Sequence, residues 1–285
     1  MKLLIFGKTG QVATELARLV PKARFLSRAE ADLTNPAACA QIIETSGADA
    51  VINAAAYTAV DKAETEAELA GLVNGAAPAA MAKAAAAKRI PFIHISTDYV
   101  FNGQGTQPWL PEAPVAPLGV YGQSKLAGET GVRAAGGVHV ILRTSWVVSA
   151  HGSNFVKTML RLASSHDTLR VVADQFGGPT PAAAIAEAVV EIATQLVANP
   201  DLAGTYHFSG APDVNWADFA RAIFAEAGLH VAVEDIPAKD YPTPAKRPAN
   251  SRLDCTSLAQ NFGLKRPDWR AGLRQIIADM KEQNA

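Results

Sequence analysis

Short runs of valine, isoleucine and leucine alternate along this chain with longer segments in which apolar residues recur at helical spacing. Successive apolar residues are typical of strands buried on both faces of a parallel sheet, and the intervening helices are typical of the layers that cover it. The pattern predicts strands over residues 2–6, 23–27, 49–53, 91–96, 138–143, 169–173 and 205–208. It predicts helices over residues 11–20, 36–45, 64–88, 121–134, 153–164, 181–197, 216–227, 256–262 and 269–281.

This alternation is regular up to about Ser145 and looser beyond it. We therefore predict an α/β fold with a Rossmann-type doubly wound parallel sheet over residues 1–145. A smaller, mainly substrate-binding domain is expected over residues 146–285, with residues 169–208 returning to the first domain. Prolines cluster between Pro237 and Pro248, which is typical of a loop-rich region that shapes a substrate site.

The composition narrows the class of protein. The chain has 285 residues, 49% of them hydrophobic, which is enough for a large core. Its formal net charge of −1, without a basic or acidic block, predicts no nucleic-acid partner and no membrane partner. The first apolar run is too short for a signal sequence or a membrane span. Two distant cysteines argue against a disulfide framework and a zinc site, so we expect a cytoplasmic protein.

A glycine-rich turn follows the first predicted strand and opens the first predicted helix. Gly7 permits a tight turn, Gly10 lets the backbone approach a pyrophosphate at the positive helix terminus, and Ala13 is small enough for close helix–sheet packing. The alternative is an ordinary strand–helix turn. We therefore expect residues 1–145 to form an NAD(P)-binding domain. The predicted cofactor contacts in this turn are Gly7, Thr9, Gly10, Gln11 and Val12.

The end of the second strand bears on the choice of cofactor. An acidic residue there would bind the 2′-hydroxyl of NAD, but this chain has Ser27 and Arg28, which suit a 2′-phosphate. We therefore predict NADPH, with NADH as the alternative, and a solvated Arg28 as the competing interpretation. Asp32 and Leu33 follow and are expected to flank the adenine.

The end of the third strand carries three small residues before an aromatic one. Ala54, Ala55 and Ala56 let a cofactor lie against the backbone, and Tyr57 follows them. We predict that these four residues contact the cofactor, although the segment alone is compatible with a simple strand end.

Tyr121 and Lys125 lie one helical turn apart in a predicted helix. A neighbouring ammonium favours the phenolate, which lowers the pKa of a tyrosine and makes it a usable proton donor near neutral pH. Thr97 ends an apolar strand upstream, where its hydroxyl either takes part in catalysis or caps a turn. Because a lone Y-x-x-x-K is common on helix surfaces, its weight depends on the surrounding motifs.

Together, the glycine turn, the Ser96-Thr97-Asp98 strand end and the Tyr121–Lys125 pair resemble the extended short-chain dehydrogenase/reductases. Longer segments resemble the dTDP-4-dehydrorhamnose reductase family in particular, and the match runs from about Lys2 to Leu273. These segments cover residues 6–12, 53–64, 96–101, 143–146, 174–180 and 247–254. The chain departs from the family pattern at Ala13, where glycine is usual, and at Gly119, where asparagine is common.

The resemblance implies NADPH-dependent reduction of the 4-keto group of dTDP-4-dehydro-6-deoxy-L-mannose to dTDP-L-rhamnose, a step of nucleotide-sugar biosynthesis for cell-wall polysaccharide. Tyr121 would protonate the developing oxyanion, Lys125 would bind the nicotinamide ribose, and Thr97 would hydrogen-bond the same oxygen. Dehydratases of similar fold carry Thr-Asp-Glu at the strand end, whereas Asp98 is followed here by Tyr99, which favours a reductase.

Five residues are candidate substrate contacts. Trp146 offers a flat apolar face to a sugar, and Asn154 is expected to donate to the diphosphate. Core packing is the alternative for Trp146 and Phe155. The full predicted set is Thr97, Asp98, Trp146, Asn154 and Phe155.

Some family members hold magnesium at a dimer contact through acidic side chains, and Glu15 and Asp279 stand at the corresponding positions. Since aspartate is shorter than glutamate, we predict no metal ligands and regard bound magnesium as doubtful. Both a monomer and a homodimer stay open. Two alternative functions also stay open: a non-catalytic NADP-binding regulatory protein of this fold, and an extended reductase or epimerase acting on another nucleotide sugar.

Overall fold

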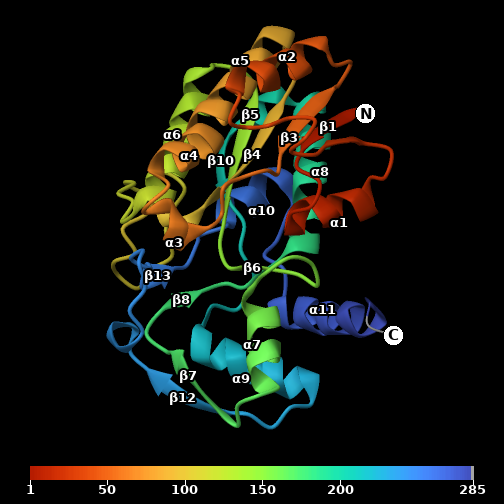
Figure 1. Cartoon of the computed structure of the whole chain (residues 1–285). Coiled ribbons are helices and arrows are strands. Elements are labelled where there is room, and N and C mark those ends of the chain that lie inside the picture. Colours follow the sequence, from red (N-terminus) through yellow and green to blue (C-terminus); the bar gives the residue numbers. More distant parts are fainter. Residues whose placement is uncertain (284–285) are drawn as a thin grey trace.

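Six parallel strands form the central sheet, in the order β10-β5-β4-β3-β1-β2 (Figure 1). The computed structural model describes residues 1–283. The strands are β1 (Leu3–Phe6), β2 (Arg24–Leu26), β3 (Ala50–Asn53), β4 (Phe92–Thr97), β5 (His139–Thr144) and β10 (Gly204–His207). The chain places β2 on one side of β1 and β3 on the other, so the carboxyl ends of β1 and β3 flank the point at which ligands bind in such sheets. The predicted doubly wound parallel sheet is confirmed.

Helices cover both faces of this sheet because its strands are apolar on both faces. Every residue of β1 and β3 is buried. One face carries α1 (Gln11–Leu19), α8 (Ala182–Ala198) and α10 (Thr256–Phe262). The other carries α2 (Pro36–Thr45), α5 (Ala77–Lys88) and α6 (Val120–Ala134).

A smaller part lies beyond the carboxyl ends of the strands, in the lower half of Figure 1. Its apolar core joins α7 (Phe155–Ala163), α9 (Trp216–Ala227) and α11 (Trp269–Gln283). The strands are short: β7 (Thr168–Val172) pairs with β12 (Ala232–Ile236), β6 (Val147–Val148) with β9 (Thr180–Pro181), and β8 (Phe176–Gly177) lies between β11 (Val214–Asn215) and β13 (Asn250–Ser251). Single 3₁₀ turns occur at Asp98–Val100, Pro200–Leu202 and Ala238–Asp240.

The segment from 169 to 208 divides between these two parts. α8 and β10 join the large sheet, whereas β7 pairs with β12 in the smaller part. In β7, exposed and buried residues alternate, which is typical of a strand covered on only one face. The assignment of functions to the two domains stays a prediction.

The helix predicted over residues 64–88 is wrong as one element. The structure has α3 (Val60–Ala63), α4 (Ala67–Gly71), a π-helical turn over Leu72–Ala76, and then α5. Pro78 lacks the N–H that an α-helix would direct to the carbonyl of Asn74, so the wider turn is accommodated there.

Among the helices of residues 1–283, none combines the length and the apolar character that crossing a membrane requires. The cytoplasmic location stays a prediction.

Candidate active site

The turn after β1 has the backbone and the open donors that a dinucleotide phosphate needs. Gly7 has φ +110°, which favours glycine, and a Cβ there would lie 3.2 Å from the backbone of Ala54. Gly10 is exposed, and no atom lies within 4 Å of the position a Cβ would take. The amides that open α1 have no side-chain cap, and its first turn has no acidic residue. The turn therefore fits a pyrophosphate at Thr9, Gly10, Gln11 and Val12.

The end of β2 offers an exposed guanidinium and a hydroxyl that is bound within the protein. The side chain of Arg28 is 80% exposed, and its Nε lies 3.9 Å from Asp32. Ser27 instead donates its hydroxyl to Glu30 at 2.7 Å, and its backbone N–H to the same carboxylate at 2.9 Å. Asp32 accepts a backbone N–H at 3.0 Å, and Leu33 is buried. Sequence reasoning missed Glu30, although its position three residues after a serine was a visible signal.

The end of β3 lies beside this turn and is held by Asn74. Ala54 donates its N–H to the carbonyl of Phe6 at 2.9 Å, and Ala55 and Ala56 follow outside any helix or strand. Asn74, in the π-helical turn, accepts from the N–H of Tyr57 at 2.8 Å and donates to its carbonyl at 2.9 Å. The four predicted residues after β3 are therefore presented beside Gly7.

Thr97 and Tyr121 lie near each other at the carboxyl end of β4, close enough for the Thr97 hydroxyl to lower the pKa of the phenol. Thr97 donates its hydroxyl to Asp98 Oδ1 at 3.1 Å, and Asp98 Oδ2 accepts from Ser251 Oγ at 2.5 Å. Thr97 Oγ1 also accepts the N–H of Tyr99 at 3.2 Å. A chain of polar contacts thus runs from Ser251 in β13 to the Tyr121 phenol.

Burial is the main cause of the pKa shifts of Asp98 and Tyr121, which lie along this series of polar contacts. It raises the pKa of Asp98 to about 6, although the hydrogen bonds from Ser251 and Thr97 oppose the shift. Burial also raises the pKa of Tyr121, with the Thr97 hydroxyl again opposing. From the sequence we predicted a lowered pKa for Tyr121, because the helical spacing placed the Lys125 ammonium beside the phenol. The structure shows the opposite shift.

Lys125 lies in α6 one turn beyond Tyr121, but its amine reaches β4. Nζ donates to the carbonyl of Ile95 at 2.7 Å and lies 3.3 Å from His94 Nε2. Lys125 is only 2% exposed, and burial lowers its pKa to about 8. Its predicted action on the phenol therefore requires the amine to turn from these partners.

Small residues let α6 approach the end of β4. A Cβ at Gly122 would lie 2.2 Å from the carbonyl oxygen of Tyr99, so a larger residue would force the helix away. The Tyr99 and Tyr121 rings meet edge to face with their centroids 5.4 Å apart. Gly122 therefore helps to place Tyr121 beside Thr97.

A buried ion pair supports the same region and was missed by sequence reasoning. Arg143 Nη2 lies 2.7 Å from Glu129 Oε2, and Arg143 Nε lies 2.8 Å from Oε1. Ser96 donates to Glu129 at 2.7 Å. Burial alone would raise the pKa of Glu129, but the hydrogen bonds and charge of Arg143 lower it overall. The pair ties α6 to β5 behind the Thr97–Tyr121 contact.

The predicted aromatic substrate contacts belong to a stack at the edge of the smaller part. The Trp146 ring lies parallel to Trp216 with centroids 3.4 Å apart, and Phe155 contacts Trp216 at 4.5 Å. Trp146 has φ +50°, a conformation that non-glycine residues adopt mainly at functional sites and turns. Trp216 was missed because its sequence context resembles an ordinary amphipathic helix.

Asn154 connects the smaller part to the glycine turn. It caps α7 and donates from Nδ2 to Gln11 Oε1 at 3.0 Å and to the carbonyl of Ser149 at 2.8 Å. Its amide is therefore committed within the protein. The predicted contact with a diphosphate stays a prediction.

Arg247 makes a second connection between the later part of the chain and the larger part, which the sequence analysis did not predict. Nη2 lies 2.6 Å from Asp61 Oδ2, and Nη1 donates to the Tyr99 hydroxyl at 3.4 Å. The proline-rich segment is thereby attached to α3 and to the turn after Thr97.

The residues at the proposed magnesium positions are paired with side chains. Arg18 Nη1 lies 3.0 Å from Asp279 and 3.5 Å from Glu15, and His151 Nε2 lies 3.5 Å from Glu15. Within residues 1–283, no three histidine, cysteine, aspartate or glutamate side chains gather as a metal site would require. The Arg18 guanidinium thus contacts both carboxylates, and the expectation that no metal is bound stays a prediction.

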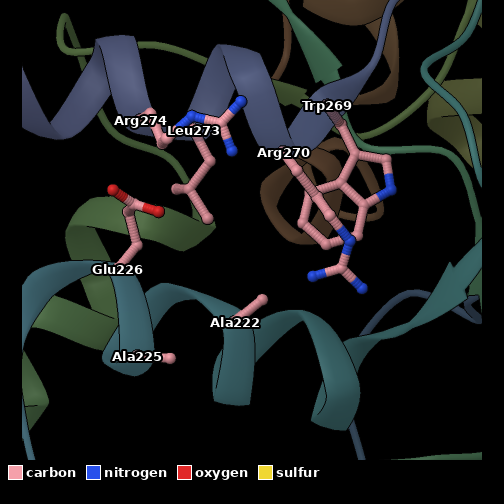
Figure 2. Close-up of a pocket in the computed structure, with 7 residues that line it drawn as sticks. All are labelled: Ala222, Ala225, Glu226, Trp269, Arg270, Leu273 and Arg274. Carbon is pink, nitrogen blue, oxygen red and sulfur yellow. The ribbon is translucent and has the colours of Figure 1, made fainter.

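A separate pocket lies between α9 and α11 (Figure 2). Arg270 lies over the Trp269 ring at 4.3 Å, and Glu226 points from α9 toward Leu273 and Arg274 at the other end of the pocket. None of the predicted site residues lines this pocket.

A threonine near a tyrosine at the end of a parallel strand, on the same edge of the sheet as a turn that fits a dinucleotide, is the arrangement of the extended short-chain dehydrogenase/reductases. Comparison with known proteins makes the assignment narrower. The family model described as the RmlD substrate binding domain matches residues 1–282. The chain is 43% identical over 293 residues to the dTDP-4-dehydrorhamnose reductase of Escherichia coli strain K12, and the match covers 98% of each chain.

Solved structures agree. A dTDP-4-dehydrorhamnose reductase from Clostridium acetobutylicum superposes with a TM-score of 0.91 at 34% identity, covering 99% of this chain and all of the other. The Bacillus anthracis reductase in complex with NADP gives 0.90 at 33% identity, covering 98% of this chain and all of the other. The chain therefore belongs to the dTDP-4-dehydrorhamnose reductase family, as its motifs predicted.

Proposed function

We propose that this protein reduces the 4-keto group of dTDP-4-dehydro-6-deoxy-L-mannose with NADPH and forms dTDP-L-rhamnose. The observation that carries the proposal is the 43% identity to a dTDP-4-dehydrorhamnose reductase over 98% of both chains. Thr97 and Tyr121, on the same edge of the sheet as the glycine turn, supply the chemistry that such a reduction needs.

Tyr121 is the proton donor of this proposal. When bound, NADPH supplies the hydride, and negative charge develops on the former keto oxygen. The phenol of Tyr121 then donates its proton to that oxygen. Its raised pKa keeps the phenol protonated in the cofactor-free protein, so the proton is present when the hydride is transferred.

Thr97 positions the phenol and, through it, the keto oxygen. Its hydroxyl donates to Asp98 and lies near the Tyr121 phenol, so its orientation is fixed by an internal carboxylate. A direct bond from Thr97 to the substrate requires the hydroxyl to turn from Asp98. Asp98 is buried and committed to Ser251 and Thr97, which supports a positioning role rather than direct substrate contact.

Arg28 is the residue that favours NADPH over NADH. Its guanidinium is exposed and only loosely paired, so it is available to a 2′-phosphate. A family member from Bacillus anthracis has been solved with NADP, which agrees with this choice. The nearby Glu30 carboxylate is held by Ser27.

The substrate is expected to lie between the two parts of the chain. In this proposal, residues 1–145 with α8 and β10 bind the cofactor, and most of the chain after residue 146 binds the nucleotide sugar. Trp146 and Phe155 offer aromatic surface to it, and the Asn154–Gln11 bond holds that surface against the cofactor turn. The protein acts as a monomer or a homodimer.

A turnover assay tests the proposal. Purified protein is mixed with NADPH and the dTDP-keto sugar generated in situ from dTDP-glucose by a dTDP-glucose 4,6-dehydratase together with a 3,5-epimerase, and the loss of NADPH absorbance is followed. We expect stoichiometric oxidation and a dTDP-L-rhamnose product, with none when the dehydratase is omitted. Tight NADPH binding without turnover would instead favour the non-catalytic regulatory function.

A further inference from the structure

His94 is a buried histidine whose two ring nitrogens both face nitrogen atoms. It lies in β4, fully buried and in register with Asn53 of β3. Its Nδ1 lies 3.2 Å from Asn53 Nδ2, and its Nε2 lies 3.3 Å from Lys125 Nζ. An amide NH₂ can only donate, and so can a lysine ammonium. A neutral imidazole has one accepting nitrogen, so it cannot accept from both partners.

His207 shows the ordinary solution in the same protein. Its Nδ1 lies 2.9 Å from the carbonyl oxygen of Trp109, and its Nε2 lies 3.4 Å from Arg143 Nη1. A single proton on Nδ1 satisfies both contacts, because the carbonyl accepts and the guanidinium donates. The two buried histidines therefore differ in the chemistry of their neighbours and not only in their position.

Protonating His94 does not resolve the conflict between its ring nitrogens and the two donor groups that face them. Burial holds its pKa well below the usual range, and the positive charge of Lys125 lowers it further. Moreover, an imidazolium carries a proton on each nitrogen, which would place donors against donors at both ends. His94 is therefore neutral.

The amide of Asn53 determines which nitrogen carries the proton. Asn53 Oδ1 accepts the backbone N–H of Ala55 at 3.2 Å, which leaves Nδ2 to face the imidazole. His94 Nδ1 therefore accepts, and its proton lies on Nε2, directed at Lys125. That N–H can donate to Lys125 only if the amine has a free lone pair. A neutral amine meets this requirement while still donating to Ile95 at 2.7 Å.

We propose that His94 is a positioning residue that favours the neutral amine of Lys125 in the cofactor-free protein, so that cofactor binding takes up one proton at Lys125. The proposal rests on the proposed function, which assigns Lys125 to the nicotinamide ribose. The proton comes from solvent and forms the ammonium, while His94 keeps its own. Burial lowers the pKa of Lys125 to about 8, which brings the neutral amine within reach of ordinary buffers.

The other charged groups around α6 leave this balance in place. Glu129, one turn beyond Lys125, raises its pKa, but it is less influential than burial and is neutralised by Arg143 from β5. Asn74, from the π-helical turn packed against α6, is uncharged. The titratable groups on Lys125's own helix and on the elements packed against it include His94, Asp98, Tyr99, Tyr121, Glu129, Arg133 and Arg143.

Calorimetry of NADPH binding in buffers of different ionisation enthalpy counts the protons taken up. We expect little uptake at about pH 7 and nearly one proton at about pH 9, since the free amine is then neutral. Above the pKa of Lys125, NADPH affinity should fall by up to about tenfold per pH unit. The 2′-phosphate titrates near pH 6, outside this range. Absence of uptake at about pH 9 would overturn the proposal.

A pair of matched variants separates His94 from burial in general. In His94→Gln, an amide oxygen can accept from the Lys125 ammonium, so uptake at about pH 9 should fall well below that of the wild type. His207→Gln makes the same change at a buried histidine that does not contact Lys125, and it should retain wild-type uptake. Equal uptake in the wild type and both variants would contradict the role of His94.

Nitrogen NMR of the unmodified protein, without cofactor, tests the proton positions even if a variant fails to fold. The expected result at about pH 9 is a proton on Nε2 of His94 and on Nδ1 of His207. A proton on Nδ1 of His94 would refute the proposal. Neither measurement needs turnover, so an inactive protein with normal proton uptake would count against the proposed reaction and not against His94.

Discussion

The two parts of this protein owe their order to different kinds of contact. In the larger part, strands of three to six residues pair in parallel and are covered by helices on both faces. In the smaller part, each of the three sheets has only two or three strands, and several of these strands are two residues long. Its core instead depends on aromatic contacts such as Trp146–Trp216 and Phe219–Trp269. A repeated backbone pattern specifies the first part, and individual side-chain contacts specify the second.

The candidate site lies where these two kinds of order meet. The larger part supplies Thr97 and Tyr121 at strand and helix ends. The later part of the chain supplies the partners that hold this region, including Ser251 on Asp98 and Asn154 on Gln11. If this comparison is sound, changes in the larger part should affect chemistry and stability strongly. Substitutions of the partner residues from the later part of the chain, such as Ser251, should have smaller effects on activity.

Tyr121→Phe should have the largest effect. The variant keeps the ring and its packing on Tyr99 but removes the proton donor. We expect kcat to fall by about 10²–10⁴-fold, with NADPH affinity nearly unchanged. Steady-state kinetics and fluorescence titration measure the two quantities. Tyr99→Phe is the matched control, because it removes only a 3.4 Å contact with Arg247 and should stay active. Substantial turnover by Tyr121→Phe would remove the phenol from its role.

Arg143→Met should be the most destabilising change. It leaves the fully buried Glu129 carboxylate without its closest cation, which typically costs about 3–5 kcal/mol. Urea unfolding should show the loss. Arg170→Met is the control from the smaller part, where the pair with Glu234 is more than half exposed and is worth about 0–1 kcal/mol. Equal losses would break the comparison between the two parts.

The same contrast explains how much could be predicted from sequence. The β1 strand, its glycine turn and α1 follow from local pattern, because the apolar run and Gly7 specify them within a few residues. The π-helical turn was missed because a pattern of apolar spacing does not reveal the consequence of Pro78 for a carbonyl four residues earlier.

The partners of the catalytic candidates depend on long-range contacts. Ser251 lies 153 residues after Asp98, and Glu129 is paired with Arg143 across two elements. Hydroxyl, carboxylate and guanidinium groups occur throughout the chain, so residue type alone does not identify these pairs. The direction of the Tyr121 pKa was wrong for the same reason, since burial outweighed the spacing of Lys125 along the helix.

Arg28→Ala should have a selective effect on the cofactor. Loss of the guanidinium should weaken NADPH by about tenfold, which corresponds to about 1.4 kcal/mol, while NADH affinity changes little. Binding titrations with both cofactors provide the measurement. Arg24→Ala, at the exposed start of the same strand, is a charge-matched control that should leave the ratio of affinities unchanged. Similar losses for NADPH and NADH would argue against a role in binding the 2′-phosphate.

Ser251→Ala should shift a pH profile with only a small loss of activity at its optimum. The serine hydroxyl donates to the Asp98 carboxylate, so its removal should raise a pKa that burial has already placed at about 6. Losing one hydrogen bond to a charged group corresponds to a shift of about one pH unit. Since ionised Asp98 orients Thr97, the acid limb of kcat/KM should move to higher pH. Ser209→Ala, a buried serine outside this chain of contacts, should leave the limb in place. An unchanged limb in Ser251→Ala would show that the later part of the chain does not tune the proton chemistry at the end of β4.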